Sequence, residues 1–96
     1  MSIMEKHILT VKKTILSHLP DAKIYFFGSR AQKTHQAFSD LDVAIHHKKT
    51  IPLETLARIK ETLANSNIPF LVDVVDFQRI TPSFQNHILS KHGLDL

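Results

Sequence analysis

Apolar side chains recur every three or four residues along the first part of the chain and predict an amphipathic helix. The recurring positions are Met4, Ile8, Val11, Ile15 and Leu19. Pro20 and Asp21 follow at once and predict that the helix ends there.

Three short runs of apolar and β-branched residues predict strands. The first run, Ile24-Tyr25-Phe26-Phe27, ends abruptly at Gly28, and its aromatic rings are expected in the core of a sheet. The second run covers residues 41–46. The third covers residues 70–76 and is nearly continuous in apolar residues, as expected for a strand covered on both faces.

Helices are predicted between these strands. A short helix is expected from Ser29 to about Lys33, and a longer one follows Thr50, the expected N-cap, with Pro52 in its first turn. The inward positions expected in the longer helix are Leu53, Leu56, Leu63 and either Ile59 or Lys60.

Thr81 and Pro82 predict the start of a last helix. Its expected inward residues are Phe84, Ile88 and Leu89, and Gly93 is its expected stop. The resulting order, α-β-α-β-α-β-α, predicts an α/β fold with one sheet and helices packed on it.

Composition narrows the class of protein. The 96 residues are 43% apolar and 22% charged, which is ordinary for a globular chain, and predict one domain over residues 1–96. The net charge of +3 is spread along the chain and does not favour nucleic-acid binding. The absence of cysteine excludes disulfides and thiol chemistry. No signal peptide or long apolar run is present, so a cytoplasmic protein without membrane contact is expected.

Carboxylates interrupt the apolar pattern at two strands. Asp40 and Asp42 are two residues apart at the start of the second strand, so both side chains point to the same side. Two adjacent carboxylates repel each other unless a cation joins them, and Mg²⁺ prefers oxygen ligands. Asp73 adds a carboxylate to the third strand, where an unpaired buried charge is costly. The alternative is structural. In that case Asp40 caps a turn with Ser39, Asp42 is a solvated strand residue and Asp73 lies at an exposed edge.

Gly28 and Ser29 favour the functional alternative. A strand that turns through Gly-Ser into a short helix presents backbone N–H groups and a hydroxyl, which suit a phosphate. Arg30 is placed either to touch a triphosphate or simply to face solvent. A phosphate cradle followed by three carboxylates predicts phosphoryl-transfer chemistry.

Asp76 competes with Asp73 for the role of third carboxylate. The two are three residues apart on one strand, so only one can point into the site. Asp73 is the preferred candidate because it is expected deeper in the apolar run, whereas Asp76 is expected to cap or face solvent at the strand end. The seven histidines lack the spacing of a zinc site.

These segments together resemble the signature of the DNA polymerase β nucleotidyltransferase superfamily, and in particular its minimal nucleotidyltransferases. The matching segments are Gly28-Ser29-Arg30-Ala31, Ser39-Asp40-Leu41-Asp42-Val43-Ala44-Ile45 and Val72-Asp73-Val74-Val75-Asp76. The resemblance covers nearly the whole chain and implies a single-domain nucleotidyltransferase fold with a mixed sheet. Members often carry a glycine where this chain has Lys33.

The resemblance also implies roles for individual residues. Gly28 and Ser29 hold the β- and γ-phosphates of a nucleoside triphosphate, and Asp40 and Asp42 coordinate two Mg²⁺ ions. Asp73 completes one metal site and helps to deprotonate the attacking hydroxyl.

The activity implied is transfer of AMP from ATP to a hydroxyl, here a tyrosine of a HEPN-family toxin partner, with release of pyrophosphate. Two alternatives stay open. The protein could neutralise its partner by contact alone, or it could modify a small molecule such as an aminoglycoside. Its short length leaves no lobe for an acceptor, so another chain is expected to present the group that it modifies.

Overall fold

The computed structural model describes residues 3–27 and 41–91 of the chain. In chain order the elements are α1 (Ile3–His18), β1 (Lys23–Phe27), β2 (Leu41–His46), α2 (Leu53–Ala64), β3 (Val72–Asp76), the 3-10 helix η1 (Phe77–Arg79) and α3 (Pro82–Lys91). The architecture confirms the predicted α/β class. The short helix expected from Ser29 and the stop expected at Gly93 lie outside the described residues.

The described strands form one mixed sheet in the order β1-β2-β3. β1 is antiparallel to β2, and β2 is parallel to β3. Two parallel neighbours need a crossover connection, which α2 supplies. Because of these strand directions, the end of β1 lies at the same end of the sheet as the starts of β2 and β3.

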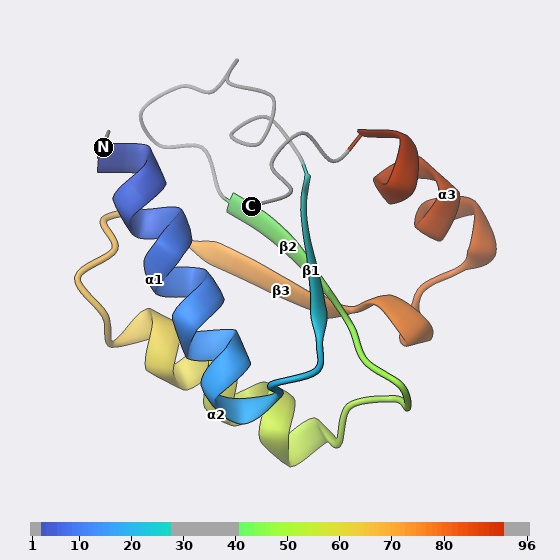
Figure 1. Cartoon of the computed structure of the whole chain (residues 1–96), viewed down its shortest axis with the longest axis horizontal. Helices are drawn as coiled ribbons and strands as arrows, with labels where there is room; N and C mark the ends of the chain where they lie inside the picture. Colours follow the sequence, from blue (N-terminus) through green and yellow to red (C-terminus); the bar gives the residue numbers. More distant parts are fainter. Residues whose placement is uncertain (1–2, 28–40, 92–96) are drawn as a thin grey trace.

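Helices cover both faces of the sheet: α1 and α2 lie on one face and α3 on the other (Figure 1). Side-chain alternation along β2 explains both layers, because Val43 and Ile45 join the larger core cluster whereas Ala44 joins the smaller one. The larger cluster also contains Ile8, Val11, Ile15 and Leu19, the apolar positions of α1. The smaller cluster consists of Phe27, Ala44, Phe77 and Ile88.

The start of α2 differs from the prediction. Pro52, not Thr50, takes the cap position, and it makes no side-chain cap bond. Leu53 is 67% exposed because it precedes the first buried turn, so the inward face consists of Leu56, Ile59 and Leu63. The open choice between Ile59 and Lys60 is thus resolved in favour of Ile59.

The last helix starts as predicted. The backbone N–H of Phe84 donates to the Thr81 hydroxyl at 3.2 Å, which caps α3. Ile88 is fully buried, whereas Leu89, expected to face inward, is 45% exposed. Within the described part of the chain, no helix is both long enough and apolar enough to cross a membrane.

Candidate nucleotidyltransferase site

Three residues form a row across one end of the sheet. Phe27, the last residue of β1, is the register partner of Asp42 on β2, and Asp42 is the register partner of Asp73 on β3. Neighbouring strands are about 4.8 Å apart, so the two carboxylates are adjacent. Two of the predicted catalytic residues, 31 positions apart in the sequence, are thus brought together.

Both carboxylates belong to the face of the sheet that α3 covers. Asp42 lies between Leu41 and Val43, and both of these pack into the core beneath α1 and α2. Asp73 lies between Val72 and Val74, which also contact that core. Because side chains alternate along a strand, the two aspartates point the other way, to the same side as each other.

The two carboxylates differ in burial. Asp42 is half-buried, whereas Asp73 is exposed. The expectation that Asp73 lies deeper in the apolar run is therefore wrong, because the strand begins at Val72 and Asp73 is near its open start. Exposure leaves the Asp73 carboxylate accessible to a substrate or an ion.

The pair fits a divalent cation in its chemistry. Like charges on adjacent strands are destabilising, and Mg²⁺ takes carboxylate oxygens as ligands. Among residues 3–27 and 41–91, no group of three or more acidic or histidine side chains could hold a metal ion. A complete site therefore needs a further ligand. Asp40, the predicted one, lies outside the described residues.

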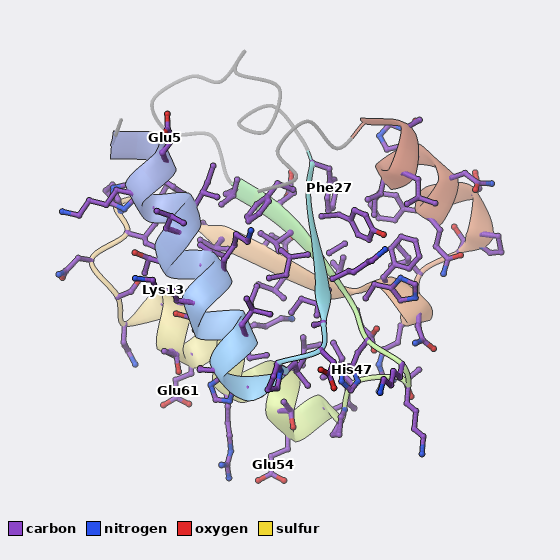
Figure 2. The ribbon with its side chains drawn as sticks, viewed as in Figure 1. Glu5, Lys13, Phe27, His47, Glu54 and Glu61 are labelled. Atoms are coloured by element: carbon purple, nitrogen blue, oxygen red, sulfur yellow. The ribbon has the colours of Figure 1, made fainter. Side chains whose placement is uncertain are left out.

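The phosphate-binding candidates Gly28, Ser29 and Arg30 also lie outside the described residues. Their immediate neighbour Phe27 is at the end of β1 (Figure 2), in register with Asp42. The described part of β1 thus ends at the register position next to Asp42.

Asp76 has a structural role at the other end of β3. It is only 3% exposed, so the expectation of a solvated strand end is wrong. Its carboxylate accepts hydrogen bonds from the backbone N–H of Ile51 at 2.8 Å, from the N–H of Gln78 at 3.0 Å and from Nε of Arg79 at 3.1 Å. The bond from Gln78 caps η1, which agrees with the capping alternative.

Arg79 completes this cluster by donating from Nη2 to the carbonyl of Ile51 at 2.8 Å. Each oxygen of the buried Asp76 carboxylate thus accepts at least one hydrogen bond, as expected for a buried polar group. By alternation Asp76 points to the face opposite Asp73, as the three-residue spacing predicts.

Aromatic packing fixes α3 beside the carboxylate row. The ring of Phe84 meets the ring of Phe27 edge-on, with centroids 5.7 Å apart and planes at 87°. His87 lies next along α3, with its ring 6.2 Å from that of Phe84. Further along β2, His46 packs on Phe77 at 4.7 Å.

No pattern in the sequence predicts the pocket that lies beside Asp73. It has a volume of about 610 Å³ and is bounded by α2, the segment before β3 and β3 itself. Its lining residues are Lys60, Leu63, Ala64, Ile68, Pro69, Phe70, Leu71, Val72, Asp73 and Val74. Most of these belong to apolar runs whose pattern also fits a buried core, so only the fold reveals them.

Comparison with known proteins agrees with this geometry. The family described as Polymerase beta, Nucleotidyltransferase matches residues 6–94. A protein of Haemophilus influenzae (strain ATCC 51907 / DSM 11121 / KW20 / Rd), "Probable protein adenylyltransferase MntA", is 39% identical over 83 residues. This match covers 83% of this chain and 71% of that protein.

Two solved structures are also similar. One, described as a toxin–antitoxin with AMP-PNP, has a TM-score of 0.72 and 25% identity, covering 91% of this chain and 68% of that chain. The other, a putative minimal nucleotidyltransferase, has a TM-score of 0.73 and 23% identity, covering 92% and 91%. The latter supports the fold alone.

The fold, the adjacent carboxylates and the family match define a nucleotidyltransferase. The chain belongs to the polymerase β nucleotidyltransferase family, and its fold is that of the minimal nucleotidyltransferase structure. The family resemblance and the enzyme class expected from the sequence are both confirmed.

Proposed function

We propose that this protein transfers AMP from ATP to a hydroxyl group of a toxin partner of the HEPN class, a tyrosine, and releases pyrophosphate. The adjacency of Asp42 and Asp73 carries the proposal, because it joins two motif carboxylates on one face. The similarity to a protein adenylyltransferase and to a toxin–antitoxin bound to AMP-PNP supports the nucleotide and the kind of partner.

The proposed roles follow the motif. Asp40, Asp42 and Asp73 hold two Mg²⁺ ions, which when bound neutralise charge on the phosphates. Gly28 and Ser29 bind the β- and γ-phosphates, and Arg30 contacts the triphosphate.

In the reaction, the acceptor oxygen attacks the α-phosphorus in line with the leaving group. The bond from the α-phosphorus to the bridging oxygen breaks, and pyrophosphate leaves with that electron pair. Asp73 receives the hydroxyl proton, for which its exposed position on the row suits it.

Labelled ATP tests the proposal directly. The protein is incubated with Mg²⁺, ATP labelled in the α-phosphate and the product of the neighbouring gene. Label on a tyrosine of that product supports the proposal, provided that it is lost with Asp42→Ala or Asp73→Asn and retained with Asp21→Asn.

Asp21 is the matched control because it is an exposed carboxylate whose contact is a 3.9 Å ion pair with Lys48. Tight binding without label identifies a protein that acts by contact alone. Label on an added aminoglycoside, but not on the neighbouring gene product, identifies a small-molecule transferase.

A further inference from the structure

The row of Phe27, Asp42 and Asp73 ends at β3, the outer strand of the sheet that the described residues form. Among the described residues, β3 pairs with β2 and with no other strand. An edge strand presents backbone N–H and C=O groups that can pair with another chain. The candidate site therefore borders a surface suited to strand addition.

The pocket beside this edge has a marked chemical character. Two of the residues that line it are charged, Lys60 and Asp73, and most of the others are apolar. Lys60 is the one cationic residue of this lining, whereas a nucleic-acid backbone needs a broadly basic surface. An apolar polypeptide side chain suits the pocket better.

Leu71 is an exposed apolar residue of the pocket lining. Its side chain is 64% exposed, although its carbonyl accepts a hydrogen bond from the Leu41 N–H at 2.9 Å. The backbone is thus held next to the start of β2 while the apolar side chain faces solvent. Backbone that is already held in place loses little conformational entropy on binding.

We propose that the acceptor segment of the partner binds as an extended strand along the open edge of β3. This inference rests on the proposed function. A fourth strand continues the row, so that one residue of the bound segment lies beside Asp73 on the same face as Asp42. This residue is the acceptor, and its hydroxyl is within reach of the carboxylate that takes its proton.

The same geometry specifies the flanking residues of the acceptor. Side chains alternate along a strand, so the residues on each side of the acceptor point to the opposite face. That is the face of α2, where the apolar walls of the pocket lie. The recognised segment is therefore a hydroxyl-bearing residue between two apolar residues, in extended conformation.

The experiment uses a synthetic peptide with tyrosine between two valines, added to the isotope-labelled full chain without ATP or metal. Backbone amide shifts are expected to concentrate at residues 71–75. A peptide with the same side chains but N-methylated at alternate backbone positions cannot pair with an edge, and its affinity is expected to fall at least about tenfold, equivalent to about 1.4 kcal/mol.

Variants of the protein separate the pocket from the rest of the surface. Leu71→Lys and Ala64→Gln change exposed pocket positions and are each expected to weaken peptide binding about tenfold. Leu53→Lys is the matched control, since Leu53 is equally exposed and does not line the pocket. It is expected to bind the peptide like the unchanged protein.

The inference is overturned if millimolar peptide shifts no amide of residues 71–75, or if the N-methylated peptide binds equally well. It is also overturned if transfer to the partner is insensitive to Leu71→Lys, a result that leaves the proposed function intact. Conversely, peptide bound at β3 in a protein that transfers AMP to no acceptor supports the docking site and contradicts the proposed function.

Discussion

Asp42 and Asp73 are register partners on two parallel strands, and both point to the face of the sheet that α3 covers. Their charges are adjacent in the folded protein and separated in the unfolded chain. We expect a cation held by both carboxylates to relieve their mutual repulsion in the folded state.

Divalent cations are therefore expected to stabilise the protein against heat. A ligand that binds only the folded state at 100 times its dissociation constant adds about 2.7 kcal/mol. Thermal unfolding with increasing Mg²⁺ measures the gain, with Asp21→Asn as a control that should respond fully. A gain in Asp73→Asn as large as in the unchanged protein contradicts the assignment.

Replacement of Asp73 by asparagine is expected to abolish most of the transfer activity. We expect a fall of about 100-fold or more, the usual scale for removing one electrostatic group from an active site. The fold should be unaffected because the side chain is exposed and relief of repulsion offsets any lost contact. Turnover with labelled ATP and the unfolding temperature of the same sample check both statements.

Replacement of Asp76 by alanine should produce the opposite result. It removes the acceptor for the buried N–H of Ile51 and for the N–H of Gln78, and it leaves Arg79 without its ion-pair partner. We expect a loss of about 3 kcal/mol or more in the free energy of unfolding. Urea unfolding measures this loss.

Asp76→Asn serves as the milder variant because it keeps one acceptor oxygen, and it should lose less stability than the alanine variant. A loss below about 1 kcal/mol in Asp76→Ala is smaller than any buried unsatisfied cluster should give. Such a result contradicts the role assigned to this carboxylate.

Phe84→Ala is expected to loosen α3 from the sheet. The change removes the edge-on contact with Phe27 and the half-buried ring from the smaller core cluster. A loss of about 2–3 kcal/mol is expected, below the usual cost for a fully buried phenylalanine. Amide hydrogen exchange should accelerate in α3 while the amides of β2 and β3 stay protected, and uniform acceleration contradicts this picture.

The sequence pattern predicts the buried layers of the fold well. Helical spacing in α1 identifies Ile8, Val11 and Ile15, all of which are buried, because only one face of this helix is apolar. Prediction fails at element ends. Leu53 continues the apolar stripe of α2 but precedes its first buried turn, and no local signal marks that limit.

The sequence predicts only part of the candidate site, because local patterns do not determine how the strands pair. The motif spacing places Asp42 and Asp73 on strands, but register and exposure depend on how those strands pair. Asp73 and Asp76 each follow a valine in one short strand. The burial of Asp76 depends on its contacts with Ile51 and Arg79, which lie outside β3. The pocket beside β3 depends on the placement of α2, which no motif encodes.

Asp73 is exposed and Asp76 is buried, so substitutions at these two positions should impair the protein in different ways. Both carboxylates belong to β3, which has five residues. The Asp73 side chain is exposed, whereas the Asp76 carboxylate holds the backbone of Ile51 in the connection that leads into α2. Loss-of-function changes should accordingly fall into two separable groups, inactive proteins that accumulate normally and active proteins that are degraded. The first group can be isolated as stable, substrate-trapping forms, and the start of β3 is the place to make them.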